Sequence, residues 1–516
     1  MNEIKKYLAY CISFSISVLT PVLIVGLILT SIWVLLLYWS QDSQSVSQAY
    51  LFKIIRFSIY QAALSSLLSV IVGFFLARFL VRRNFFAKPF VIACLNASFT
   101  MPVMVVIIMV VLFYGHSGLI QSLIEFNVYG FSGILIAHVF LNAPYCARLY
   151  LNVLSSQKTA LMQQAALLQF NDYFCFKYLD WPLLKPIILP SFGFIFLICF
   201  NSFAIVKIFG SNSITTLEVA IYHAIKHQFD IHQASIYAMY QFSIGFIVAI
   251  SLLRFNAIKL YSFSKSKVFR ADKNYLSAKI IDTLVVLVLI CFWCLPFIWV
   301  FKKLSVASIL KVFNHSTFYQ ALFNSIWMAT LSSILVLFFC LGLLLRPLQN
   351  KKGNDIIAMS LFFFPAIVVA SGLYIGLKAY WFDTPIMLCL VILMNALIAL
   401  PYAYNVIRQP VKQNYDRYKP LMQSLDMSLY YQIKMVLLPI SIKPVVLAWC
   451  FSWVIAFGDF SMIALMITDN FKTLPLLVYD RLGTHQLQEA AVTALVLLSI
   501  TIVVYYIQEK WNHAKD

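Results

Sequence analysis

Residues 57–77 read FSIYQAALSSLLSVIVGFFLA, and residues 323–345 read FNSIWMATLSSILVLFFCLGLLL. Both stretches are apolar over about 20 residues, the length that an α-helix needs to cross the hydrocarbon core of a bilayer. Both also carry Ser-Ile near the start, at Ser58 and Ser325, and Leu-Ser-Ser soon afterwards. These two stretches therefore predict membrane-spanning helices and an internal repeat at the same time.

The whole chain has the composition of a polytopic membrane protein. Of its 516 residues, 62% are hydrophobic and only 11% are charged, whereas soluble domains are about 45–50% apolar and about 25% charged. This composition excludes a soluble globular enzyme and a disordered chain. The net charge of +19 would favour nucleic-acid binding in a soluble protein, but no basic nucleic-acid-binding fold is visible. We therefore expect no nucleic-acid partner, and we interpret the basic residues as markers of the cytoplasmic side.

Hydropathy predicts an all-α fold with about twelve membrane-spanning helices. The expected spans are residues 13–38, 57–77, 90–113, 133–147, 187–209, 235–253, 281–301, 323–345, 356–377, 385–404, 445–467 and 490–507. An even number of spans places both termini on one side of the membrane. Lys and Arg are concentrated in the segments on that side, which predicts that both termini are cytoplasmic.

The two halves of the chain match at a nearly fixed offset. The matching pairs are Pro144-Tyr145 with Pro401-Tyr402, Trp181-Pro182 with Leu438-Pro439, Leu217 with Leu474, and Tyr222 with Tyr479, each 257 positions apart. Six spans per repeat is an even number, so the repeats have the same orientation and are related by an axis along the membrane normal. We expect a first repeat at 1–253, a basic cytoplasmic linker at 254–279 and a second repeat at 280–516, with a pathway along the axis.

Two long loops follow the fourth and tenth spans, at the same place in each repeat. Each is predicted to form a helix, a tight turn and a short second helix, because residues such as Leu161, Ala165 and Leu168 recur at helical spacing. Asn171 and Ser428, 257 positions apart, are suitable N-caps for the second helix, and the proline that follows is expected to end it. Such a surface suits either the lipid interface or a soluble partner. Two copies at matching positions favour a partner that is itself two-fold.

At these loops the sequence resembles the inner-membrane permeases of binding-protein-dependent ABC importers. The family pattern is Glu-Ala-Ala, three residues and Gly, followed further on by Leu-Pro. Here Gln163-Gln164-Ala165 and Gln169 occupy those places in the first loop, and Pro420-Leu421-Met422 and Asp426 occupy them in the second. Neither copy has the acid or the glycine of the family pattern.

Further stretches narrow the resemblance to the permeases of thiamine ABC importers. In the second repeat these are residues 457–460 (FGDF), 471–475 (FKTLP) and 490–495 (AAVTAL). In the first repeat, residues 56–62 and 215–222 resemble the same family. The similarity extends over most of residues 50–510, and fused iron(III) permeases share parts of the pattern.

The resemblance implies a type I ABC importer permease fold in the bacterial inner membrane, and a chain that moves thiamine or its phosphates. The alternatives are a fused iron(III) permease and an ion-coupled secondary transporter. The implied partners are two copies of a cytoplasmic ATPase, a periplasmic substrate-binding protein and the lipid bilayer. The residues expected to dock the ATPase are Gln163, Gln164, Ala165, Gln169, Asn171, Asp172, Tyr173, Phe174, Met422, Ser424, Asp426, Ser428, Tyr430 and Tyr431.

The sequence carries no motif for chemistry of its own. It has no glycine-rich phosphate loop with a lysine, so we expect no enzyme activity, cofactor or metal on this chain, and ATP and Mg²⁺ on the partner. Asp459 is the acid expected deep in a span, where a carboxylate costs about 2.5–3.5 kcal/mol. We expect it to face the translocation pathway, or else to cap a loop at the outer end of its helix. Ser202 is its counterpart in the first repeat.

Overall fold

The computed structural model is built from helices. It describes residues 2–40, 47–83, 88–89, 91–92, 95, 101–116, 118–123, 125–155, 159–210, 214–254, 276–348, 357–358, 361, 364–378, 384–428, 431–466 and 471–513. Within these ranges the regular elements are α- and π-helices, which confirms the all-α polytopic fold. Nine of the described helices are long and apolar enough to cross a membrane, or eleven if each of two bent pairs forms one span. The total of twelve stays a prediction.

The twelve expected spans place six in each half, and the structure has shorter helices between the long ones. The first half contains α1 (Asn2–Trp39), α2 (Gln48–Arg82), α4 (Val103–Tyr114), α5 (Leu119–Leu123), α6 (Phe131–Leu154), α7 (Thr159–Leu167), α8 (Asp172–Cys175), the π-helix η1 (Phe176–Asp180), α9 (Trp181–Phe200), α10 (Phe203–Phe209), α11 (Leu217–His223), the π-helix η2 (Ala224–Gln228) and α12 (Ile231–Arg254). Residues 90, 93–94 and 96–100 of the expected third span lie outside the described residues.

The second half follows a similar order, although α18 is one continuous helix where the first half has α6 and α7. It contains α13 (Leu276–Lys303), α14 (Val306–Phe313), α15 (Ser316–Leu348), α17 (Ala366–Lys378), α18 (Thr384–Ser424), the π-helix η3 (Gln432–Leu437), α20 (Leu438–Ile440), α21 (Ile442–Phe457), α22 (Ser461–Met466), α23 (Leu474–Gly483) and α24 (Leu487–His513). Most of the expected linker, residues 255–275, lies outside the described residues. The domain boundaries therefore stay a prediction.

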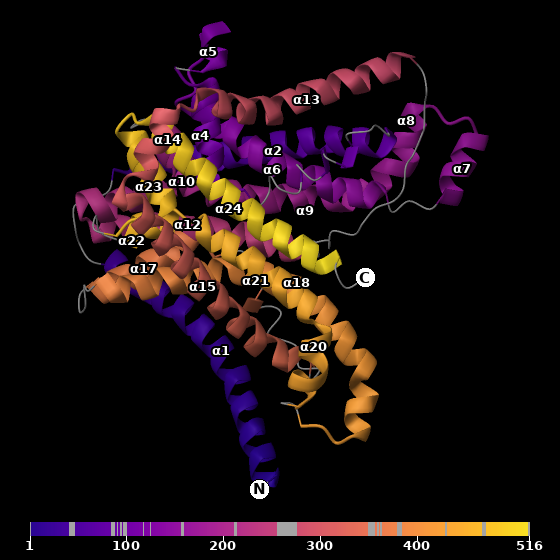
Figure 1. Ribbon diagram of the computed structural model, residues 1–516, viewed down its shortest axis with the longest axis vertical. Helices are drawn as coiled ribbons and strands as arrows, with labels where there is room; N and C mark the ends of the chain where they lie inside the picture. Colours follow the sequence, from indigo (N-terminus) through magenta and orange to yellow (C-terminus); the bar gives the residue numbers. More distant parts are fainter. Residues whose placement is uncertain are drawn as a thin grey trace.

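The two halves exchange their first helices. Helix α1 packs against α15 and α17 of the second half, and α13 packs against α2 and α4 of the first half. In Figure 1 most purple helices of the first half form an upper lobe, and most orange helices of the second half form a lower lobe. Helix α1, in indigo, lies along the lower lobe, and α13 lies along the upper lobe. Because each half covers the apolar face of the other, the halves cannot separate without exposing both.

The internal sequence repeat corresponds to two equivalent hydrogen bonds, one in each half. The backbone N–H of Leu217 donates to Ser58 Oγ at 3.0 Å, and the N–H of Leu474 donates to Ser325 Oγ at 2.8 Å. Both serines are buried in long helices, and both leucines begin short helices, α11 and α23. The sequence repeat therefore corresponds to the same tertiary contact made twice.

The expected fifth and eleventh spans, residues 187–209 and 445–467, are not continuous helices, so those two predictions are wrong. Helix α9 ends at Phe200 and α10 begins at Phe203, while α21 ends at Phe457 and α22 begins at Ser461. Hydropathy cannot detect these breaks because the residues on both sides of each break are apolar. Polar or small residues, Asn201-Ser202 and Gly458-Asp459, occupy the breaks themselves.

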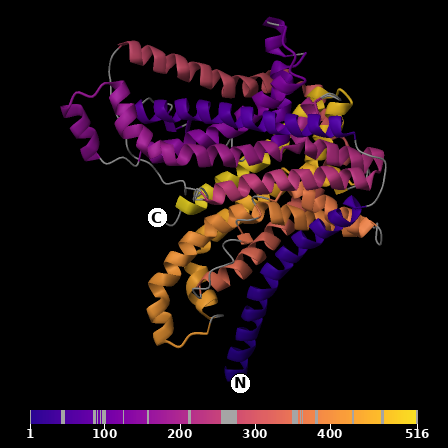
Figure 2. The same ribbon diagram turned by 180° about the vertical axis from the view of Figure 1, so that it is seen from behind.

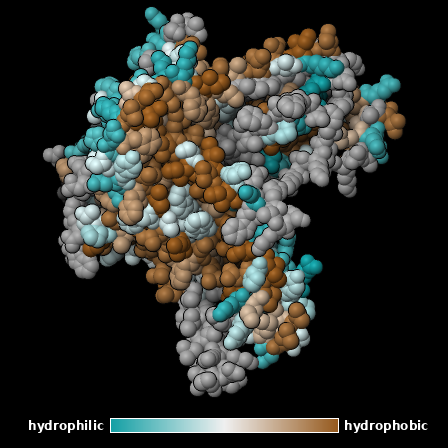
Figure 3. Space-filling view, in the orientation of Figure 1, coloured by the Kyte–Doolittle hydropathy of each residue, from teal (hydrophilic) through white to brown (hydrophobic). Residues whose placement is uncertain are grey.

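The two ends of the bundle differ. Figures 1 and 2 show α7 and α8 at one end of the upper lobe, and the far end of α18 with α20 at the corresponding end of the lower lobe. At this end the two lobes diverge, and Figure 3 shows an open notch between them. At the opposite end α10, α17, α22 and α23 lie close together (Figure 1). We call these the loop end and the closed end.

Candidate functional site: the paired loops and the closed end

Both loops turn through a residue in the left-handed conformation, at the position where the permease pattern has glycine. Gln169 has φ 52° and Asp426 has φ 46°. After Gln169, the N–H of Phe170 donates to Ala165 O at 3.0 Å; after Asp426, the N–H of Met427 donates to Met422 O at 3.1 Å. Each bond links residues five positions apart, as in the helix-ending motif that favours glycine. Both loops therefore adopt the turn that glycine favours, although neither has a glycine there.

The two expected N-caps behave differently. Asn171 caps α8, because its Oδ1 accepts the N–H of Phe174 at 2.9 Å. The hydroxyl of Ser428 is buried and has no partner in the described part of the second loop, so the prediction of a second cap is wrong. Instead the side chain of Gln432 donates to Met427 O at 2.7 Å, and its N–H donates to Ser428 O at 2.9 Å. These two bonds fix the start of η3 in place of a cap.

The prolines after the loops do not end the helices, contrary to expectation. Pro182 and Pro439 lie in the first turns of α9 and α20, and each follows directly on a π-helix, η1 or η3. Proline is tolerated in a first helical turn because the missing N–H has no intrahelical acceptor there. The first loop therefore passes into α9 without a non-helical linker, whereas Ser441 separates α20 from α21 in the second half, where the helix axis bends by 74°.

The predicted docking residues divide into exposed and buried ones. Gln163, Gln164, Gln169, Asn171, Tyr173, Phe174, Ser424, Asp426 and Tyr431 are exposed. Ala165 and Met422, 257 positions apart, are both buried and support the turns from beneath. Tyr430 and the side chain of Asp172 lie outside the described residues. Figure 3 shows α7 standing out from the body of the molecule.

The first loop carries an exposed aromatic cluster that the sequence predicted only in part. The rings of Phe170, Phe174 and Tyr178 lie 5.9–6.1 Å apart. The Lys177 ammonium lies over the Tyr178 ring at 5.4 Å from the centroid, and Tyr173 adjoins Phe174. At the positions of Phe170 and Tyr178 the second loop has methionines. The two loops therefore share the left-handed turn but present different side chains.

At the closed end, one aromatic residue of each repeat stacks on its own counterpart. Phe203 and Phe460 are 257 positions apart, and their ring centroids lie 5.7 Å apart with an interplanar angle of 20°. The ring centroid of Phe203 lies 5.1 Å from that of Tyr222, and the ring centroid of Phe460 lies 4.9 Å from that of Tyr479. Tyr222 and Tyr479 form another repeat pair. The four rings make a symmetric aromatic row across the axis, and both phenylalanines are buried.

Asp459 and Ser202 immediately precede the two stacked phenylalanines. The Asp459 carboxylate accepts the N–H of Ser461 at 3.1 Å and of Met462 at 3.3 Å, and thus caps α22. This is the capping arrangement that the sequence left open for Asp459. Ser202 is the N-cap residue of α10 but makes no such side-chain bond. Sequence reasoning missed Phe203 and Phe460 themselves, although both are aromatic and share the 257-residue offset.

Gly458, at the break before Asp459, lies close to the first half of the chain. A Cβ atom on Gly458 would lie 3.1 Å from Cβ of Pro102, which starts α4 in the first half. Such a contact is closer than ordinary van der Waals packing. The two halves therefore approach each other closely at Gly458 and Pro102.

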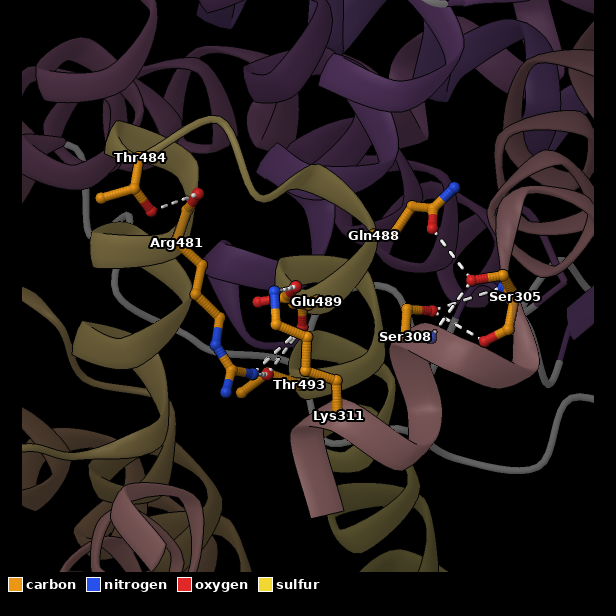
Figure 4. Close-up of polar contacts among 8 residues, drawn as sticks. All are labelled: Ser305, Ser308, Lys311, Arg481, Thr484, Gln488, Glu489 and Thr493. Carbon is orange, nitrogen blue, oxygen red and sulfur yellow. Dashed lines mark hydrogen bonds and ion pairs between the residues drawn. The ribbon is translucent and has the colours of Figure 1, made fainter. Parts of the chain in front are cut away.

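A polar network fastens the short helices of the second half at this end (Figure 4). The buried Arg481 of α23 donates to Glu489 O at 3.2 Å and to the hydroxyl of Thr493 in α24. The Glu489 carboxylate in turn pairs with Lys311 of α14. The consecutive helices α23 and α24 are thereby held to the distant α14 beside the aromatic row.

Comparison with known proteins identifies relatives over nearly the full length. The chain is 32% identical to the thiamine transport system permease protein of Haemophilus influenzae over 484 residues, which is 90% of each chain. It is 31% identical to that of Escherichia coli over 92% of each chain, and 30% identical to that of Salmonella typhimurium over 90% of each. No protein-family model matches the chain.

Proposed function

The chain belongs to the family of thiamine transport system permease proteins, and from this premise we propose how its loops and its axis carry out transport. The protein is the membrane-spanning permease subunit of an ATP-driven ABC importer for thiamine. It is a multi-pass protein of the inner membrane, and ATP hydrolysis resides on a separate subunit. No described feature favours an iron(III) permease or an ion-coupled transporter.

The observation that carries the proposal is the pair of left-handed turns at Gln169 and Asp426, which present equivalent backbones at one end of the bundle. Two copies of one ATPase subunit dock there, one on each loop, and this end faces the cytoplasm together with both termini. Exposed side chains such as Tyr173, Phe174 and Tyr431 enter the ATPase surface. The buried Ala165 and Met422 keep the turns in shape.

Docking on a two-fold ATPase gives these loops a mechanical role. η1 continues into α9, and η3 continues into α20, which bends by 74° into α21. A displacement of either loop is therefore passed to α9 or α21, the helices that lead to the closed end. When the ATPases close, the loops approach one another and the lobes rock about the axis. Phe203 and Phe460 then part, and the pathway opens toward a periplasmic binding protein.

In the present arrangement the aromatic row closes the pathway at its outer end. Ser202 and Asp459 line this end, and Asp459 holds Phe460 in place through the start of α22. A carboxylate beside the axis also favours a substrate with a cationic ring. No cofactor or metal is required on this chain, because ATP and Mg²⁺ act on the partner.

Uptake by cells tests this function. A bacterial strain that lacks its own thiamine permease should regain uptake of labelled thiamine when it expresses this chain with its ATPase and binding protein. Iron(III) uptake in the same strain should not change. Restored iron(III) uptake without thiamine uptake would instead favour the alternative permease.

A further inference from the structure

Beside the aromatic row lies a lysine that no described acid neutralises. Lys207 of α10 is half-buried, and its ammonium lies over the Tyr222 ring at 4.6 Å from the centroid. Its Nζ donates to His223 Nε2 at 3.2 Å. No carboxylate among the described residues pairs with it. A cation that is taken partly out of water without a counter-charge is costly, so this position suits an anion.

Two histidines complete the corner around Lys207. The ring centroids of His223 and His227 lie 5.0 Å apart. They lie 5.7 and 5.5 Å from the ring centroid of Tyr222, respectively. Burial and the nearby Lys207 lower the pKa of His223 to about 4, so that this imidazole is neutral at pH 7. Asp230, the next acid along the chain, accepts the N–H of Gln233 at the start of α12.

The second half differs at the equivalent place. The counterpart of His223 is Asp480, and it is paired with Lys472 at 2.7 Å. The counterpart of Lys207 is Ala464. The aromatic row is therefore symmetric, while its surroundings are not: one end has an unneutralised ammonium and the other has a closed ion pair.

We propose that Lys207, His223 and His227 form an anion subsite at the outer mouth of the pathway, which receives the phosphate of a phosphorylated form of the substrate. The proposal rests on the proposed function. Tyr222 contacts both Phe203 and Lys207, which lie one turn apart on α10. A planar ring at the parted phenylalanines would therefore hold a phosphate on a short arm near Lys207. The ammonium and imidazole then donate hydrogen bonds to the phosphate oxygens, which are strong acceptors. Unphosphorylated thiamine, which is a cation, gains no binding energy from this anion subsite.

The test compares two substrates in the complete importer. The permease, its ATPase and its binding protein are reconstituted in proteoliposomes, and the KM for uptake of thiamine and of thiamine monophosphate is measured. Lys207→Gln should raise the KM for the monophosphate about tenfold, the loss expected for one charge-assisted hydrogen bond. The KM for thiamine should stay the same or fall. Lys207→Arg should retain most of the affinity for the monophosphate.

The matched control is Lys472→Gln, which removes the ammonium from the paired position in the second half and should leave the ratio of the two KM values unchanged. His223→Gln is a second test variant and should raise the ratio less than Lys207→Gln. An unchanged ratio in both test variants overturns the proposal, and so does an equal loss for both substrates, which would indicate packing or docking of the binding protein. A wild-type importer that carries thiamine but not its monophosphate also overturns it. An importer that carries neither contradicts the proposed function instead.

Discussion

Phe203 stacks on Phe460, the residue 257 positions later, so that one residue of each repeat meets its own counterpart at the closed end. Equivalent residues can meet in this way only near the axis that relates the two repeats. The pair therefore marks the axis in the structure, and it does so directly after the breaks that end α9 and α21.

If this stack closes the pathway, its loss should make the permease leak. Phe203→Ala and Phe460→Ala should each increase the efflux of labelled thiamine from proteoliposomes without ATP, by severalfold, because a ring is removed from the closure. Phe196→Ala is the control: Phe196 stacks on Phe200 at the same 5.7 Å, but both rings belong to α9. Equal efflux from the control and the test variants would contradict the gate.

The exposed aromatic residues of the loops should couple the permease to its ATPase. Replacing Tyr173 and Phe174 by Ala should reduce copurification with the ATPase about tenfold, as expected for buried aromatic contacts at an interface. Replacing Tyr430 and Tyr431 should have a smaller effect, because the second loop lacks the cluster around Phe170. Pull-down at matched membrane abundance measures both. Normal copurification and wild-type transport in both variants would rule out the docking assignment.

The left-handed turns should be improved by glycine. Gln169→Gly should stabilise the first loop by about 1 kcal/mol, because a residue with a Cβ atom pays roughly that cost at positive φ. Asp426→Gly should gain less, since Asp tolerates this conformation better. Thermal unfolding of the purified permease detects the change, and Gln164→Gly within α7 should lower stability instead. A loss of stability in Gln169→Gly would show that the turn does not need this conformation.

Asp459 should act mainly through its capping bonds. Asp459→Asn keeps one acceptor oxygen for the N–H groups of α22, so thiamine uptake should fall less than twofold. Asp459→Ala removes both bonds, costs about 1 kcal/mol and should reduce uptake further by displacing Phe460. Uptake at matched abundance distinguishes the two roles. An Asn variant as slow as the Ala variant would mean that the charge itself acts on the substrate.

The repeat was the most informative feature of the sequence. The sequence alone aligns Ser58 with Ser325 and Leu217 with Leu474. In the structure Leu217 bonds to Ser58, and Leu474 bonds in the same way to Ser325. Gln169 and Asp426 were assigned to the glycine position by alignment, and both adopt the conformation that glycine favours. These features could be predicted because local backbone geometry and repeated packing both leave marks at fixed spacing.

Features that depend on contacts between the halves could not be predicted. Hydropathy continues across Asn201-Ser202 and Gly458-Asp459, so the helix breaks left only a weak signal of small and polar residues. The exchange of α1 and α13 has no sequence pattern, because lipid-facing and helix-facing surfaces are equally apolar. The unneutralised Lys207 became visible only once its neighbours were known.

Transport by purified components tests the central claim most directly. Proteoliposomes that contain this permease and its ATPase should accumulate labelled thiamine against a gradient when both ATP and the periplasmic binding protein are supplied, each on its own side of the membrane. Omission of the ATPase, of ATP or of the binding protein should abolish accumulation. Accumulation by the permease alone, driven by an ion gradient without ATP, would contradict the account.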